Sequence, residues 1–102
     1  MVRVTFAPQA RRDLIEITDY LSAIAGPHTA RKYETRMKRL IDNLRDVPSS
    51  GSPRREFGPS VRILIVRPYL IFYEDQSDRG DVLILRILHG SRNITDELVK
   101  AG

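Results

Sequence analysis

The stretch that decides the fold is ILRILHGSRN, residues 84–93. Its apolar residues extend the preceding DVL into one continuous run, DVLILRIL at residues 81–88, which is typical of a β-strand. Arg86 lies inside the run, and His89 and Arg92 follow it. A His and two Arg at a strand end have three interpretations: a ribonuclease site that moves protons and holds phosphate, a docking patch, or solvated side chains.

Two further runs rich in Val, Ile, Leu, Phe and Tyr precede this strand, VRILIV at 61–66 and YLIFYE at 69–74. The links between the three runs, RP and DQSDRG, have the composition of turns, so the runs predict a three-stranded antiparallel meander. The segment before them, VPSSGSPRREFGPS at 47–60, contains three Pro and two Gly and is therefore a predicted loop.

The first half of the chain has a different periodicity. VRVTF at residues 2–6 alternates apolar and polar side chains, which predicts a strand with one buried face. Helices are predicted from about Pro8 to Ala25 and from about Pro27 to Asp46, because apolar residues recur three and four positions apart and Gly26 separates the two stripes. The stripes consist of Leu14, Ile17, Leu21 and Ile24, widened by Ile15, and of Ala30, Tyr33, Met37, Leu40, Ile41 and Leu44.

The element order β-α-α-β-β-β predicts a single α+β domain, residues 1–102, with the helical hairpin packed on one face of an antiparallel sheet that the first strand joins. The tail, NITDELVKAG at 93–102, adds a short helix with Thr95 as a possible N-cap.

Strand alternation assigns the last strand two faces. The two sets are Leu83, Leu85 and Ile87, and Val82, Ile84, Arg86 and Leu88. Because Arg is almost never fully buried without a partner, we expect the Leu83 face to meet the helices and the Arg86 face to stay open. An open face that still carries apolar side chains favours a binding partner.

Composition excludes several classes of protein. The chain has 102 residues with 41% hydrophobic and 29% charged residues, which suits one soluble globular domain. It has no Cys, no apolar run long enough for a membrane span and no signal-peptide block, so we expect a cytoplasmic protein without disulfides. It also lacks a nucleophile elbow, a phosphate-binding Gly loop and a helix-borne His pair, so no cofactor and no metal site are predicted.

The charge of the chain is dominated by Arg. The formal net charge is +4, and the 17 basic residues consist of 14 Arg and 3 Lys. Because the guanidinium group grips carboxylates and phosphates in pairs, this composition predicts an acidic partner, either nucleic acid or an acidic protein surface. A genome whose base composition favours Arg codons is the alternative explanation.

The runs PRREFGPSVRILIVRPYLIFYED and DVLILRILHGSRN resemble the ParE toxins of type II toxin–antitoxin systems, in the ParE/RelE superfamily. FAPQARRDLIEITDYL resembles the opening of the same family. The matching features, in chain order, are Arg54 and Arg55, Arg62, Tyr69 to Tyr73 and the Ile-Leu-Arg-Ile-Leu-His-Gly-x-Arg run that ends at Arg92. The resemblance implies a β-α-α-β-β-β fold and a ParD-type antitoxin from the same operon, whose C-terminal segment wraps the toxin in a hetero-oligomer.

The superfamily divides by activity. ParE-like members inhibit DNA gyrase, whereas RelE-like members cut mRNA on the ribosome. The RelE-like members carry basic residues at positions that match Ile63, Ile65 and Leu70 here, and a Tyr or His near the C-terminus that this chain lacks after His89. The resemblance therefore implies a gyrase-inhibiting binding protein with no catalytic residues. A RelE-like mRNA interferase, built on the His89–Arg92 pair, and a degenerate toxin kept for its antitoxin are the alternatives.

The residues predicted to contact gyrase, the gyrase–DNA complex or the antitoxin are Arg54, Arg55, Arg62, Arg67, Arg86, His89 and Arg92. Each has a structural alternative. Arg86 could pair with a neighbouring carboxylate, Glu74 or Asp75, and His89 could bond locally at the strand end. Tyr69 and Tyr73 are interpreted as packing residues.

Overall fold

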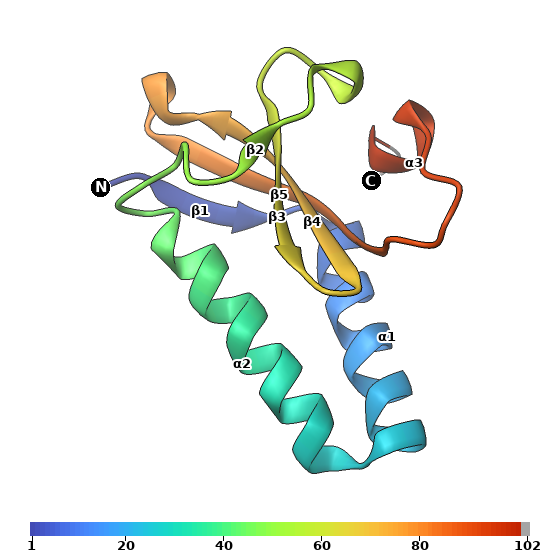
Figure 1. Ribbon diagram of the computed structural model, residues 1–102. Helices are drawn as coiled ribbons and strands as arrows, with labels where there is room; N and C mark the ends of the chain where they lie inside the picture. The colour runs from blue at the N-terminus through green and yellow to red at the C-terminus, as the bar shows by residue number, and fades with distance from the viewer. Residues whose placement is uncertain (101–102) are drawn as a thin grey trace.

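The computed structural model describes residues 1–100, so the last two residues of the predicted tail, 101–102, lie outside the described part. The elements are β1 (Arg3–Phe6), α1 (Pro8–Ala25), α2 (Pro27–Asn43), β2 (Ser52–Pro53), η1 (Arg55–Phe57), β3 (Val61–Val66), β4 (Tyr69–Gln76), η2 (Ser77–Arg79), β5 (Asp81–His89) and α3 (Asp96–Lys100). This order confirms the predicted β-α-α-β-β-β arrangement and the short helix predicted in the tail, which is α3, and it adds the short β2 (Figure 1). Within residues 1–100, no helix is long and apolar enough to cross a bilayer.

The strands form one sheet in the order β1-β5-β4-β3-β2. The β3–β4 and β4–β5 pairs are antiparallel, as the meander predicts, but β1 pairs in parallel with β5. The sheet is therefore mixed rather than antiparallel throughout. The helical hairpin between β1 and β3 is long enough to cross one face of the sheet, so that β3 can run in the same direction as β1. Since β3 and β5 are both antiparallel to β4, β5 also runs parallel to β1.

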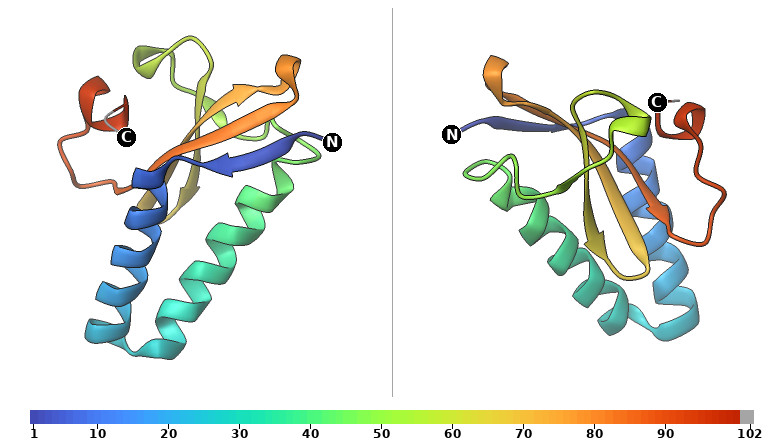
Figure 2. Two further views of the ribbon diagram at one scale, coloured as in Figure 1. Left: turned by 180° about the vertical axis from the view of Figure 1, so that it is seen from behind. Right: turned by 45° about the horizontal axis from the view of Figure 1, so that its top comes forward.

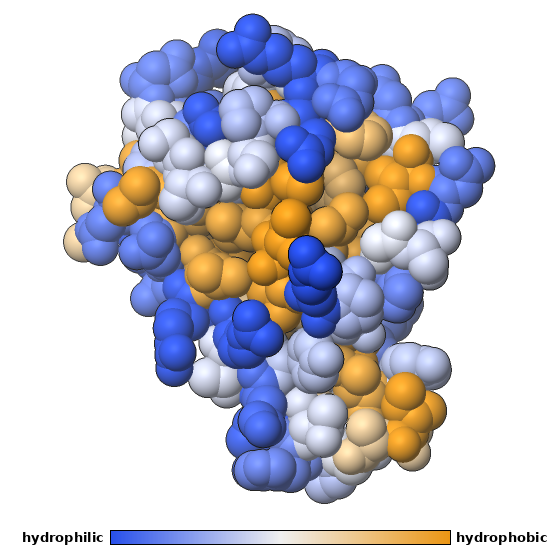
Figure 3. All heavy atoms as spheres, in the orientation of Figure 1, coloured by the Kyte–Doolittle hydropathy of each residue, from blue (hydrophilic) through white to orange (hydrophobic). Residues whose placement is uncertain are grey.

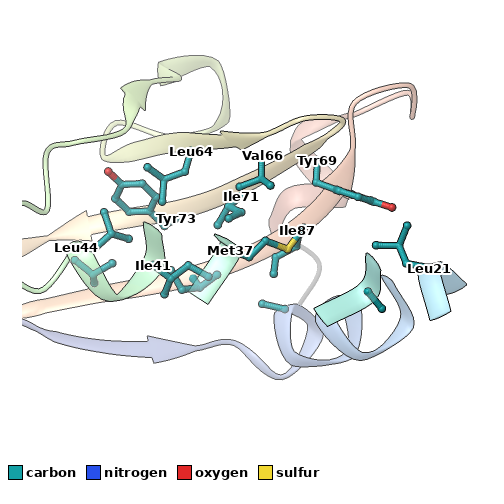
Figure 4. Close-up of a cluster of buried hydrophobic side chains, with 14 residues drawn as sticks. Leu21, Met37, Ile41, Leu44, Leu64, Val66, Tyr69, Ile71, Tyr73 and Ile87 are labelled. Atoms are coloured by element: carbon teal, nitrogen blue, oxygen red, sulfur yellow. The ribbon is translucent and has the colours of Figure 1, made fainter. Parts of the chain in front are cut away.

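The α1–α2 hairpin covers one face of the sheet and extends beyond its end (Figure 1). Pro8 begins α1 at a position that needs no N–H bond, and Gly26, at φ 93°, ends it with its N–H bonded to Ser22 O. The overhang explains why Ile24 is 61% exposed although the helical spacing places it on the predicted stripe. Core residues from both helices and the sheet meet between the layers in Figure 4.

A β-bulge in β5 changes which side chains face the helices. Phe72 of β4 pairs with Arg86 and Tyr73 pairs with Ile84, which leaves Leu85 as the extra residue. Val82 and Ile84 consequently belong to the helix-facing core, and Leu85 packs on the opposite face. The predicted faces were wrong for these residues because uninterrupted alternation cannot account for an inserted residue. The assignments of Ile87 to the helix face and Leu88 to the other face are confirmed.

The second face of the sheet is partly covered by the C-terminal tail. Val99 of α3 is 1% exposed and packs with Ile63, Phe72 and Leu88. The predicted N-cap is confirmed, since Thr95 Oγ1 accepts a hydrogen bond from Leu98 N at 3.1 Å. Figure 3 shows apolar side chains gathered in the middle of this face, toward α3. Beyond the tail the face is open, and Ile65 stays 51% exposed.

Candidate functional site

Arg86 is buried in an ion pair. It is 5% exposed, and its Nε and Nη2 lie 2.7 and 3.0 Å from the two carboxylate oxygens of Asp13, which is also 5% exposed. This paired geometry satisfies the planar fork of the guanidinium. Arg86 therefore pairs with a carboxylate, as its structural alternative predicts, but that carboxylate is Asp13 and not Glu74 or Asp75. The expectation of an open Arg86 side chain is wrong.

The pair also ties three segments of the chain together. β1 ends opposite Ile84, so the later part of β5 has no neighbour on that side. Asp13 of α1 satisfies the backbone at this edge, since its Oδ2 accepts a hydrogen bond from Ile87 N at 2.9 Å. Arg86 Nη1 in turn donates to Leu98 O at 2.8 Å, which fixes α3. Because its donors are occupied in this way, Arg86 stabilises the fold and lies beneath the contact surface described below.

The sequence interpretation missed Asp13, although a signal for it exists. The helical stripe of α1 contains Ala10, Leu14 and Ile17, and a spacing of three and four residues places Asp13 among them. A carboxylate on an apolar stripe requires a buried cation. Arg86, an Arg inside an apolar strand, is the complementary signal 73 residues away.

One group of basic residues lies at the β2–η1 end of the sheet and consists of the exposed Arg55 and the half-buried Arg54 and Arg62. Arg62 is held in place: its Nη1 donates to Gly51 O at 2.9 Å and its Nε lies 3.5 Å from Asp75 Oδ2. Arg54 Nη1 donates to the carbonyl of Pro53 at 2.9 Å, and Arg55 is exposed in η1. Arg54 and Arg62 are therefore held against the backbone of this region, and Arg55 is the exposed cation of the group.

Tyr73 of β4 holds the loop that leads into β2, residues 48–51. Its hydroxyl donates to Pro48 O at 2.7 Å and accepts from Gly51 N at 2.9 Å. A Cβ at position 51 would lie 2.6 Å from Ile63 O, so only Gly allows this close approach. Burial raises the pKa of Tyr73 above its ordinary value, against the smaller opposing effect of the Gly51 bond. The interpretation of Tyr69 and Tyr73 as packing residues is confirmed, because they are 5% and 0% exposed.

The second group, Arg67, His89 and Arg92, lies at the opposite end of the sheet. The six residues of β3 separate the two ends by roughly 17 Å at the usual rise per residue. Arg67 is exposed in the β3–β4 turn, which Gly90 N joins to the end of β5 through a 2.7 Å bond to Pro68 O. The six predicted site residues other than Arg86 therefore form two separate basic groups.

His89 makes the local bond that was predicted as its structural alternative. Its Nδ1 accepts from Ser91 N at 3.0 Å, which leaves the proton of the neutral ring on Nε2. The ring packs edge-on against Tyr69, with centroids 5.5 Å apart. His89 and Arg92 line a cleft of about 410 Å³ whose other wall is α1, including Glu16 and Tyr20. The cleft combines an apolar body with charged rims of both signs.

On the second face of the sheet, the three positions that match the basic residues of RelE-like toxins carry apolar side chains. Ile63, Ile65 and Leu70 are apolar, and Ile63 and Leu70 pack in the cluster beneath α3. Within residues 1–100, no three His, Asp or Glu side chains are grouped so that they could hold a metal ion. These three positions of the described sheet therefore present apolar side chains and no cation.

Comparisons with known proteins agree with these features. The family model for the ParE toxin of the type II toxin–antitoxin system, parDE, matches residues 4–94. Toxin ParE3 of Caulobacter vibrioides is 31% identical over 75 residues, which are 74% of this chain and 73% of that protein.

Solved structures of toxin–antitoxin systems have a similar fold. A chain of the chromosomal ParDE TA system from P. aeruginosa matches with a TM-score of 0.72 and 25% identity, over 87% of this chain and 96% of that one. A chain of the RelBE2 toxin–antitoxin complex from Mycobacterium tuberculosis, 21% identical with a TM-score of 0.61, shares the fold over 86% of this chain and 96% of its own. With the family model spanning nearly the whole length, the chain belongs to the ParE toxin family of type II toxin–antitoxin systems.

Proposed function

We propose that this toxin arrests growth by binding DNA gyrase or the gyrase–DNA complex, and that a ParD-type antitoxin from the same operon neutralises it. The toxin acts as a binding protein and not as an enzyme. The observation that carries the proposal is the apolar character of Ile63, Ile65 and Leu70, at positions where mRNA-cleaving relatives carry basic residues. Apolar side chains can neither transfer a proton nor stabilise a phosphate in a transition state.

The proposed contact surface consists of the two basic groups, Arg54, Arg55 and Arg62 at one end and Arg67, His89 and Arg92 at the other. Exposed cations such as Arg55, Arg67 and Arg92 attract acidic protein surfaces and DNA phosphates and orient the encounter. The ParDE neighbour supports an antitoxin of the ParD type as the second partner.

The proposal is tested by expressing the toxin in cells without its antitoxin. We expect growth arrest, a loss of plasmid supercoiling and intact mRNA. Arg67→Glu is expected to weaken the arrest, whereas Arg31→Glu on α2, an exposed Arg outside both basic groups, is the control with the same charge change and is expected to leave it unaltered. Growth arrest with normal supercoiling would contradict the proposal.

One observation favours a second function, a RelE-like mRNA interferase. The cleft between β5 and α1 brings Glu16, His89 and Arg92 together, and a carboxylate, an imidazole and a guanidinium could serve as base, acid and phosphate ligand. This candidate predicts cleaved mRNA during arrest, and His89→Ala abolishes the cleavage. Intact mRNA in arrested cells would dismiss it.

A further inference from the structure

Ile65 is an exposed apolar residue near the end of β3, on the face of the sheet opposite the helices. Its neighbours Leu64 and Val66 belong to the helix-facing core, so strand alternation turns Ile65 to the second face. It is 51% exposed, and Leu70, directly across from it on β4, is half-buried. In the right view of Figure 2, the β3–β4 turn lies at the end of the sheet away from α3 and η1. Because α3 packs against η1, the tail leaves the turn end of this face uncovered.

The backbone of Ile65 also lacks a partner. On the side of β3 away from β4, Val61 O accepts a hydrogen bond from Arg54 N at 2.8 Å. Peptide groups alternate along an antiparallel strand, so the N–H and C=O groups of Ile65 point to that same side. The pairing of β2 with β3 ends at Ile63, and within residues 1–100 neither group of Ile65 has a hydrogen-bond partner. A free edge of this kind accepts backbone bonds from another protein.

The charges at this end of the sheet are mostly positive. The two segments that meet there, residues 63–73 and 82–95, contain no Asp or Glu, and their basic residues are Arg67, Arg86, His89 and Arg92. Arg86 is paired with the buried Asp13, whereas Arg67 and Arg92 are exposed.

The helices next to the sheet supply carboxylates that are already engaged or lie across the cleft. Glu34 of α2 is 3.5 Å from Lys38, and Glu16 of α1 lines the cleft that Arg92 also lines. Within residues 1–100, Arg67 has no ion-pair partner. The surplus of cations beside Ile65 therefore favours an acidic partner.

We infer that this end of the sheet binds an acidic protein surface of gyrase, with Ile65 as the apolar anchor of the contact. The partner packs apolar side chains over Ile65 and Leu70, sets carboxylates against Arg67, and bonds to the free peptide groups of Ile65. The inference rests on the proposed function and specifies that the protein part of the gyrase–DNA complex, and not the DNA, meets this end of the toxin.

The apolar side chain distinguishes a protein partner from DNA. Contacts to the DNA backbone are made by cations and hydrogen-bond donors, so an exposed Ile gains little there. DNA could use Ile65 only as a wedge between base pairs, and such a wedge would leave the peptide groups of the strand without partners. An aliphatic anchor flanked by Arg is instead typical of a protein–protein contact.

A second copy of this chain fits this edge less well. Two β3 strands paired antiparallel about Ile65 would set Ile63 of one copy opposite Arg67 of the other. The edge at Ile63 is already occupied by β2, so the pairing could not extend in that direction. Both copies would also bring exposed Arg side chains to the contact, and like charges repel.

The test compares two small changes at the same position. Ile65→Val keeps an apolar β-branched side chain, whereas Ile65→Thr has nearly the same shape as Val but carries a hydroxyl, and both suit an exposed strand. Ile24→Thr, at an apolar residue of similar exposure at the end of α1, is the matched control. Urea denaturation of the purified full-length variants checks that each one is folded.

Each toxin is titrated into a supercoiling reaction, and its binding to gyrase without DNA and to a linear duplex without gyrase is measured separately. We expect Ile65→Thr to require about ten-fold more toxin for half-inhibition and to bind gyrase about ten-fold more weakly, as the loss of one anchoring contact does. Ile65→Val and Ile24→Thr should remain close to the unsubstituted toxin. The amide of Ile65 should exchange more slowly in the gyrase complex than in the free toxin.

The outcomes separate the inference from the proposed function. A folded toxin that leaves supercoiling unchanged overturns gyrase as the target, and the inference with it. Inhibition that Ile65→Thr weakens no more than Ile24→Thr does overturns the inference alone. Binding to the duplex without gyrase that Ile65→Thr weakens would assign this end to DNA, and protection of the Ile65 amide in the free toxin at rising concentration would assign it to a second copy of this chain. Either result would overturn the inference.

Discussion

Replacing Asp13 with Ala removes the carboxylate that joins α1 to β5 and that pairs with Arg86, the residue bonded to α3. Three bonds are lost, from Arg86 Nε, Arg86 Nη2 and Ile87 N, at 2.7, 3.0 and 2.9 Å. Both partners of the ion pair are 5% exposed, so water cannot replace the carboxylate without a rearrangement. The guanidinium keeps only its bond to Leu98 O.

The magnitude follows from these contacts. Removing one partner of a buried ion pair costs about 3–5 kcal/mol, because the remaining charge is left uncompensated. The orphaned N–H of Ile87 is part of that cost, since a buried unsatisfied donor costs roughly 1–3 kcal/mol. A domain of this size loses about 4–8 °C in Tm for each kcal/mol, so a 3 kcal/mol loss lowers the Tm by at least about 12 °C.

Urea denaturation followed by far-UV circular dichroism measures the change in unfolding free energy. Asp19→Ala, on an exposed turn of the same helix, is the matched control and should cost less than about 0.5 kcal/mol. The double variant Asp13→Leu with Arg86→Met should recover most of the loss, because a buried ion pair exchanged for apolar side chains is often neutral or stabilising. A cost below about 1 kcal/mol for Asp13→Ala, or a double variant no more stable than the single one, would refute this reasoning.

Three further predictions concern the buried tyrosines and the loop above them. Tyr73→Phe leaves Pro48 O and Gly51 N unpaired and should cost about 1–3 kcal/mol in urea denaturation. Gly51→Ala should cost a similar amount, about 1–3 kcal/mol, because its Cβ would lie 2.6 Å from Ile63 O, and an unchanged stability would contradict the close packing. Burial, followed by the influence of Tyr33 and Tyr20, raises the pKa of Tyr69 above 10.0, so the unfolded state releases this proton first and stability falls as the pH rises above 10.0. Tyr69→Phe should lessen that fall, as measured by denaturation at increasing pH, and an identical pH profile in the variant would count against it.

Much of the fold was predictable because Pro and Gly residues mark the ends of the helices and hydrophobic periodicity marks their extent. Pro8 and Gly26 bound α1 at the predicted residues, and β3 spans the predicted VRILIV. β2 was missed because a strand of two residues, Ser52–Pro53, is too short to show any alternation. The parallel pairing of β1 with β5 depends on contacts between the two ends of the chain, which periodicity does not encode.

The candidate site was less predictable from the sequence, because it depends on a β-bulge and on a long-range ion pair. The bulge at Leu85 reverses the alternation that placed Val82 and Ile84 on the open face, and no composition signal marks it. The only sequence signal for Asp13 is that a carboxylate occurs on the apolar stripe of α1. The position of His89 was predicted better, because its bond to Ser91 is local. A local bond can be inferred from a short stretch, whereas the Asp13–Arg86 pair is indicated only by two separate signals that lie 73 residues apart.

Whether this ParE toxin acts on gyrase can be measured by DNA supercoiling with purified gyrase and folded toxin. We expect the toxin to inhibit supercoiling and prior binding of the antitoxin to restore it. Supercoiling that continues unchanged at a clear molar excess of folded toxin would show that gyrase is not the target.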